Sequence, residues 1–114
     1  MIAIEDAAID AQDKQLLVEA KEIIASALPG CTVLLFGSVA RGTHGPESDY
    51  DVLILSDKKL TYPEQDAIRN KIFDFELDKG AVFSMLFMSR EEWESSPQRS
   101  APFYFNVQRD AVVL

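Results

Sequence analysis

The chain has a single cysteine and no long apolar run, and each shortage excludes a class of protein. Cys31 alone cannot form an internal disulfide, and it has no neighbouring histidine or cysteine with which to bind zinc. We expect it to be a small buried residue at the start of a strand. No apolar stretch approaches the ~20 residues that cross a membrane. The sequence therefore predicts no membrane association.

Basic residues are also scarce, since 11 Lys and Arg face 19 Asp and Glu and leave a net charge of −8. Affinity for long nucleic acids comes largely from Lys and Arg that displace counterions from phosphates. The composition therefore disfavours a long DNA or RNA substrate. It is compatible with a small magnesium–nucleotide ligand, whose metal compensates the charge.

The remaining composition is that of an ordinary globular protein, with 47% hydrophobic and 26% charged residues. The length of 114 residues and the lack of internal repeats or low-complexity tracts predict one domain, residues 1–114. Residues 1–6 lack the basic start and long apolar stretch of a signal peptide, so we expect a cytoplasmic protein.

Apolar periodicity and helix-capping patterns predict an alternation of helices and strands. Thr61 and Glu64 have the spacing of a capping box, and so do Ser89 and Glu92. The nearly continuous apolar run 81–88 predicts a strand buried on both faces. The expected elements are a helix over 14–28, a strand over 32–36, a helical turn over 39–41, a strand over 49–55, a helix from 61 to before 80, a strand over 81–88, a turn from 89 that Trp93 pins to the core, a helix from about 100–102 and a strand over 111–114.

The most informative segment joins the first two of these strands. A Gly37-Ser38 turn directly follows an apolar strand, and Asp49 and Asp51 stand at the head of the next one. Alternate residues of a strand point to the same face, so the two carboxylates project together, about 6.6 Å apart along the strand. Such a pair can hold a divalent metal, and the turn can receive a phosphate on its N–H groups and hydroxyl. The segment therefore indicates a site for a metal–nucleoside triphosphate.

This segment resembles the signature of the nucleotidyltransferase superfamily related to DNA polymerase beta. It is most similar to the form G-S-x-A-R-G-x5-S-D-x-D of the small stand-alone minimal nucleotidyltransferases. The resemblance implies an α+β fold, with a small mixed β-sheet and helices mainly on one face, as in the polymerase beta-like palm. The eight matching positions are Gly37, Ser38, Ala40, Arg41, Gly42, Ser48, Asp49 and Asp51.

The resemblance also implies a reaction, in which a hydroxyl attacks the α-phosphate of a nucleoside triphosphate and pyrophosphate leaves. Asp49 and Asp51 would be catalytic and would bind Mg²⁺ or Mn²⁺, which prefer oxygen ligands. Gly37 and Ser38 would cradle the β- and γ-phosphates of the triphosphate, ATP above the others.

Two interpretations stay open for Arg41, which either contacts a phosphate or pairs with Glu47 or another acid to hold the loop. Thr43 and His44 lie in the same loop, where we expect solvent-exposed side chains more than triphosphate contacts.

The family usually supplies a third carboxylate from the strand after the long helix, and residues 81–88 contain no acid. Ser84 is the polar residue of that strand and would occupy the third position. A neutral hydroxyl is a poor metal ligand and a very weak base. The alternative is that Asp74, Glu76 or Asp78 reaches the site from the helix before it.

Two functions follow from the resemblance. The first is an enzyme that transfers a nucleoside monophosphate, AMP above the others, to a hydroxyl of a protein or small molecule. The second is a catalytically weakened nucleotide-binding regulator, similar to the antitoxin partners of helical HEPN-domain proteins in toxin–antitoxin pairs. The expected partners are a nucleoside triphosphate, a HEPN-type protein and, as an alternative, further copies of the chain.

Overall fold

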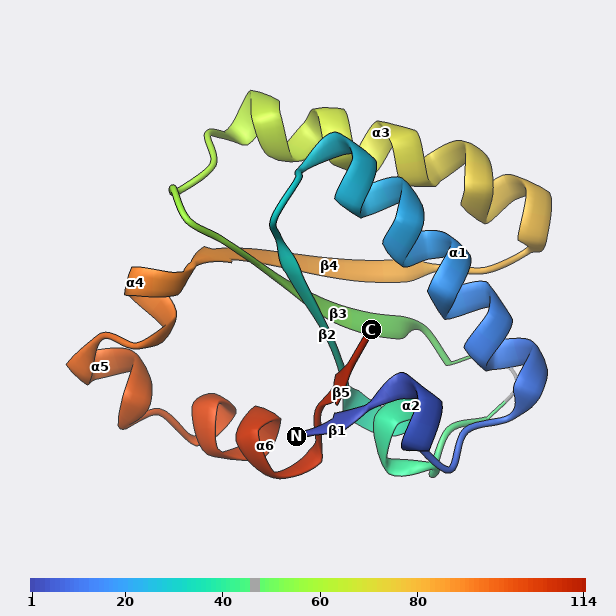
Figure 1. Ribbon diagram of the computed structural model, residues 1–114, viewed down its shortest axis with the longest axis horizontal. Helices are drawn as coiled ribbons and strands as arrows, with labels where there is room; N and C mark the ends of the chain where they lie inside the picture. Colours follow the sequence, from blue (N-terminus) through green and yellow to red (C-terminus); the bar gives the residue numbers. More distant parts are fainter. Residues whose placement is uncertain (46–47) are drawn as a thin grey trace.

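Five strands form one mixed sheet in the computed structural model, which describes residues 1–45 and 48–114. The spatial order is β1-β5-β2-β3-β4 (Figure 1). β2 runs antiparallel to both β3 and β5, whereas β3–β4 and β1–β5 are parallel pairs. The strands are β1 (Ile2–Ala3), β2 (Thr32–Phe36), β3 (Tyr50–Ser56), β4 (Phe83–Ser89) and β5 (Val112–Val113). The predicted α+β fold with a small mixed sheet is confirmed.

Three of the helices begin at a residue whose side chain caps them. Asp10 caps the first α-helix by accepting hydrogen bonds from the N–H groups of Gln12 (2.8 Å) and Asp13 (3.4 Å), so this helix starts three residues before its predicted position. The capping boxes at Thr61 and Ser89 form as predicted. The elements are η1 (Ile4–Asp6, a 3₁₀ turn), α1 (Ala11–Ala27), α2 (Gly37–Arg41), α3 (Tyr62–Lys79), α4 (Arg90–Trp93), α5 (Ser96–Arg99) and α6 (Pro102–Asp110).

The two faces of the sheet are covered by different helices. Figure 1 shows the long helices α1 and α3 together on one side of the sheet and the short helices α4, α5 and α6 on the other. Under α1 and α3 lie the alternate residues Val33, Leu35, Val52 and Ile54. On the opposite face Leu34, Leu53 and Leu55 pack against residues of α4 and α6, namely Trp93, Tyr104 and Val107. Trp93 is buried, as predicted.

The prediction that β4 is buried on both faces is wrong. β4 is an edge strand that pairs only with β3 among the described residues, and Ser84 and Leu86 are exposed on the face opposite α3. An apolar run of this length indicates a strand buried on both faces. Whether another strand or a helix covers each side depends on the tertiary fold, which the local pattern does not reveal. Cys31 is only half-buried and lies just before β2.

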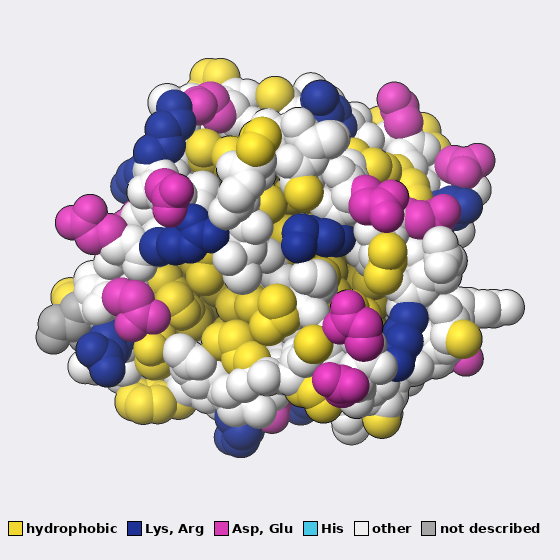
Figure 2. Space-filling model, viewed as in Figure 1, with side chains coloured by type: hydrophobic (Ala, Val, Ile, Leu, Met, Phe, Trp, Pro, Cys, Tyr) yellow, Lys and Arg dark blue, Asp and Glu magenta, His cyan; other side chains and the backbone are white. Residues whose placement is uncertain are grey.

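The surface mixes charges of both signs. Figure 2 shows one face of the molecule, on which basic and acidic side chains surround an apolar middle. The described side chains on this face therefore form no basic stripe of the kind that follows a phosphate backbone. Within the described part of the chain, no helix is both long and apolar enough to span a membrane.

Candidate nucleotide and metal site

Gly37 makes the turn that joins β2 to α2. Its φ of 77° is in the left-handed region, which side chains other than glycine rarely adopt. α2 begins with no side chain capping its first N–H groups, and its C-terminal Gly42 is also left-handed, with φ 73°. Among the described residues no side chain caps the first backbone N–H groups of α2, which an acceptor from outside the chain could therefore approach.

Asp51 lies directly against this turn. In the β2–β3 ladder Asp51 pairs with Phe36, the residue before Gly37. A Cβ atom built on Gly37 would overlap the Oδ2 atom of Asp51 and would lie only 3.2 Å from its Cγ. The positive φ and the close Asp51 carboxylate therefore both favour glycine at position 37.

Asp49 and Asp51 influence each other electrostatically. The pKa of Asp51 is raised, first because burial disfavours its charge and then because the carboxylate of Asp49 is near, while Arg41 partly opposes the shift. Asp49 is exposed and precedes β3 by one residue, whereas Asp51 is half-buried. A cation between the two carboxylates would relieve their repulsion. Among the described residues no group of three or more Asp, Glu, His or Cys side chains is placed to hold a metal.

Ser84 stands beside Asp51. The parallel β3–β4 register pairs these two residues, so their side chains project from the same face, on strands about 4.8 Å apart. The acids of α3 do not share this position, because α3 packs on the opposite face. Glu76 instead accepts a hydrogen bond of 2.8 Å from the N–H of Phe83, and Asp74 and Asp78 are exposed.

Arg41 ends α2 on the exposed side of the turn. It lines a cavity of about 130 Å³ together with Gly37 and with residues of α6 that include Phe103, Asn106 and Asp110. Arg41 favours the charged forms of Asp51 and Asp110, although the pKa of Asp51 is raised overall and the pKa of Asp110 is lowered first by the hydrogen bond from Arg109. Arg41 makes no ion pair with a carboxylate among the described residues. The alternative partner considered from the sequence, residue 47, lies outside the described residues.

Three polar side chains next to the motif, those of Asp13, Tyr50 and His44, interact in a way that the sequence did not reveal. The Tyr50 hydroxyl donates to Oδ1 of Asp13 at 2.7 Å, and His44 Nε2 lies 3.4 Å from Oδ2 of the same carboxylate. Tyr50 also stacks on Phe83, and burial followed by the Asp13 contact raises its pKa to about 12. His44 is half-buried, so the expectation of a solvent-exposed side chain is wrong. Thr43 is exposed as expected.

This group anchors the loop that carries the signature motif to the first turn of α1. No local pattern could have identified it, because Asp13 lies 37 residues before Tyr50 in the chain. The only available signal was the pair of polar atoms on Tyr50 and His44, which need partners when they are partly buried.

The cavities next to the motif are small. Besides the cavity beside Arg41, one of about 300 Å³ lies between Asp49 and the α3–β4 connection, where Lys79 and Gly80 line it. A larger cavity, of about 760 Å³, is on the outer edge of β4 and contains none of the residues of the motif.

The sequence from residue 17 to residue 106 matches the nucleotidyltransferase domain family. This span is most of the chain, and the chain therefore belongs to that family. The sequence has no significant match among curated proteins.

Three solved structures have a similar fold. One is a toxin–antitoxin complex with AMP-PNP, with 16% identity and a TM-score of 0.56 over 85% of this chain and 68% of that chain. Another is the MntA–HpeT toxin–antitoxin with two aspartates, two positions apart, replaced by glutamate, with 14% identity and a TM-score of 0.58 over 84% and 69%. The third is the tri-AMPylated HEPN toxin of Shewanella oneidensis in complex with MNT antitoxin, with 14% identity and a TM-score of 0.54 over 86% and 67%. At these identities the likeness establishes a shared fold alone.

Replacing Gly37 by alanine tests the contact with Asp51. Gly37→Ala and Gly42→Ala both impose a left-handed alanine, at about 1–2 kcal/mol each, but Gly42 has open space around its Cβ position. We expect Gly37→Ala to lower the free energy of unfolding measured with urea by clearly more than Gly42→Ala does. The double variant Gly37→Ala/Asp51→Ala should recover part of the difference, because the overlapping carboxylate is gone. Equal losses at the two glycines would contradict the contact.

Proposed function

We propose that the protein binds a magnesium–nucleoside triphosphate at the Gly37 turn and transfers the nucleoside monophosphate to a hydroxyl. The observation that carries this proposal is the contact between Gly37 and Asp51, which brings a carboxylate to the start of α2, where no side chain of the described residues caps the backbone N–H groups. If the turn and the acid only happened to lie at the ends of neighbouring strands, the carboxylate would not need to occupy the space of a Cβ atom at residue 37.

The donor set fits a hard divalent cation. Asp49 and Asp51 offer carboxylate oxygens, which Mg²⁺ and Mn²⁺ prefer, and their mutual repulsion favours a positive charge between them. These two residues would hold the metal, which when bound neutralises charge on the triphosphate and on the leaving pyrophosphate. Ser38 and the first N–H groups of α2 would bind the β- and γ-phosphates. Arg41 is close enough to influence Asp51 and would add a positive charge at the same point.

ATP is the triphosphate that we favour, and a HEPN-type helical protein is the partner. Two structures with the same fold support this choice, one a toxin–antitoxin complex with AMP-PNP and the other an AMPylated HEPN toxin in complex with an antitoxin. The chain would act as one domain over residues 1–114. A protein hydroxyl on the partner would then be the acceptor.

A second function is favoured by a specific observation. Ser84 takes the position beside Asp51 at which a third carboxylate would stand, and the acids of α3 lie on the other face. The attacking hydroxyl then lacks an anionic base among these residues. In this alternative the chain binds the nucleotide but turns it over slowly, and it acts as an antitoxin-like regulator of its partner.

Thermal unfolding with nucleotide and metal tests the binding site. The wild type should melt several degrees higher with Mg²⁺ and ATP, because a ligand at 100 times its Kd stabilises by about 2.7 kcal/mol. Asp49→Asn/Asp51→Asn should abolish the magnesium-dependent part of the shift. Asp74→Asn/Asp78→Asn is the matched control, since it removes the same charge from exposed positions on α3 and should respond as the wild type does. A wild type that ignores all four triphosphates, or a site variant that responds normally, would contradict the site.

Ser84→Asp separates the two functions. An added carboxylate beside Asp51 should tighten Mn²⁺ binding and raise metal-dependent pyrophosphate release from ATP, while lowering stability without metal through repulsion. Ser84→Asn is the control, because it has a similar size and no charge. Slow turnover in the wild type that rises only in Ser84→Asp would support the regulator. Rapid wild-type turnover that requires Asp74, Glu76 or Asp78 would refute the role given to position 84.

A further inference from the structure

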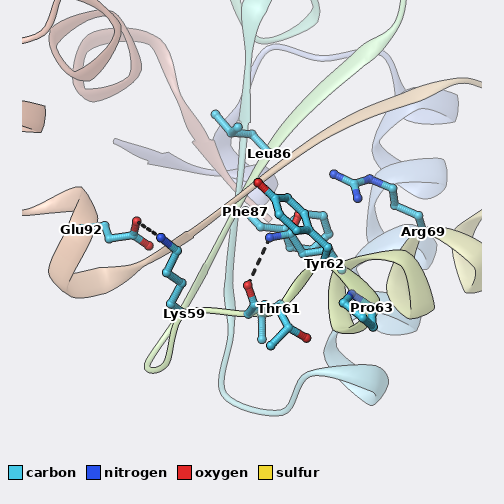
Figure 3. Close-up of a pocket in the computed structure, with 10 residues that line it drawn as sticks. Lys59, Thr61, Tyr62, Pro63, Arg69, Leu86, Phe87 and Glu92 are labelled. Atoms are coloured by element: carbon cyan, nitrogen blue, oxygen red, sulfur yellow. Dashed lines mark hydrogen bonds and ion pairs between the residues drawn. The ribbon is translucent and has the colours of Figure 1, made fainter.

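The outer edge of β4 borders a groove, and no described strand pairs with the backbone on this side. The cavity of about 760 Å³ runs along this edge between the β3–α3 connection, the N-terminal half of α3 and the start of α4. Figure 3 shows Lys59 and Glu92 at one end of this edge groove and Arg69 at the other, with Leu86 and Phe87 of β4 between them. Leu86 is 43% exposed and gives the groove an apolar surface.

The backbone groups that face the groove follow from the pairing with β3. Tyr50 donates its N–H to the Val82 carbonyl, so residues 82, 84, 86 and 88 direct their backbone groups inward to β3. Phe83, Met85 and Phe87 direct theirs outward. Glu76 already accepts the Phe83 N–H at 2.8 Å. The N–H and C=O groups of Met85 and Phe87 are then left for an added strand, because no described strand pairs with this side of β4.

The charged groups of the edge groove differ in sign from the chain as a whole. Two cations, Lys59 and Arg69, and one anion, Glu92, line it in a chain whose net charge is −8. The Glu92 carboxylate is used by the α4 cap, where its Oε1 accepts the Ser89 N–H at 3.0 Å. The ion pairs of Lys59 with Glu92 and of Arg69 with Asp66 are both exposed, so each can be exchanged for a new partner at little cost.

We propose that the edge groove binds an extended, acidic peptide segment of a partner protein as a sixth strand. The backbone of that segment pairs with Met85 and Phe87, an apolar side chain covers Leu86, and carboxylates meet Lys59 and Arg69. Arg69 lies 5.0 Å above the ring of Phe87, which holds its guanidinium over the groove. The proposal does not depend on nucleotide binding, because none of the motif residues lines this groove.

A second copy of the chain fits the edge groove less well. Pairing β4 with β4 around a two-fold axis would bring Lys59 and Arg69 of both copies into one shared space. The groove of each copy would then contribute two cations and one anion, Glu92, so positive charge would exceed negative charge in the shared space. An acidic strand therefore offers the edge groove more opposite charge than a second copy does.

Synthetic peptides test the proposal on the full chain. The probe is a hexapeptide of alternating valine and glutamate with blocked termini. One control replaces each glutamate by lysine. The other is the acidic peptide with alternate backbone nitrogens methylated, so that one edge of its strand cannot donate hydrogen bonds. In fluorescence anisotropy titrations with labelled peptides, the acidic peptide should bind about ten-fold more tightly than the basic one. The N-methylated peptide should not bind. Amide shifts in NMR spectra should concentrate at residues 85–87. Equal affinity for both charges, undiminished binding of the N-methylated peptide, or shifts elsewhere would overturn the proposal.

Charge variants locate the preference. The double variant Lys59→Glu/Arg69→Glu should bind the basic peptide more tightly than the acidic one. The double variant Lys59→Gln/Arg69→Gln, which makes a smaller change to the surface, should bind both peptides equally. Lys71→Glu/Arg99→Glu changes the net charge equally at exposed positions outside the edge groove and should keep the preference for the acidic peptide. Light scattering on the chain without peptide measures whether a second copy of the chain occupies the edge groove instead. A dimer in which the amides of Met85 and Phe87 are protected from exchange would overturn the proposal in favour of a second copy.

Discussion

The approach of the Asp51 carboxylate to the backbone of Gly37 is the constraint around which the candidate site is built. It depends on the antiparallel β2–β3 register, which pairs Asp51 with Phe36, and on a left-handed backbone at residue 37. The same register places Asp51 beside Ser84 on the other neighbouring strand. A shift of β3 by one residue would turn Asp51 toward α1 and α3 and would separate it from the turn.

The core maintains this register from both sides of the sheet. Val52 and Ile54 are fully buried under α1 and α3, and Leu53 is fully buried under the C-terminal helices. Behind the motif, Asp13 ties Tyr50 and His44 to the first turn of α1. The half-buried Asp51 and its neighbour Asp49 repel each other, so the packing energy of β3 holds together two charges that would separate in an unfolded chain. Repulsion of this kind is common at sites that bind cations.

Local patterns predicted much of this arrangement, and long-range contacts account for the rest. The motif identified the Gly37 turn and the acid pair, because its residues are close in sequence. The position of Ser84 beside Asp51 followed instead from the family resemblance, since the two residues are far apart in the chain. The role of Asp13 was not predictable, since its partners are 31 and 37 residues away and its own neighbourhood reads only as a helix start. The exposure of Leu86 was missed because an apolar run does not reveal which strand forms the edge of a sheet.

The most direct measurement of the central idea is the free energy of unfolding of Asp51→Asn against the wild type, with and without Mg²⁺ and ATP. The raised pKa means that ionised Asp51 weakens the fold, so wild-type stability falls as pH rises through the titration of this carboxyl. Without ligand, Asp51→Asn should therefore be the more stable protein at neutral pH, and its advantage should shrink in acid. With Mg²⁺ and ATP the order should reverse. A wild type that is more stable than Asp51→Asn without ligand, and that is not stabilised by Mg²⁺ and ATP, would contradict a cation site at Asp49 and Asp51.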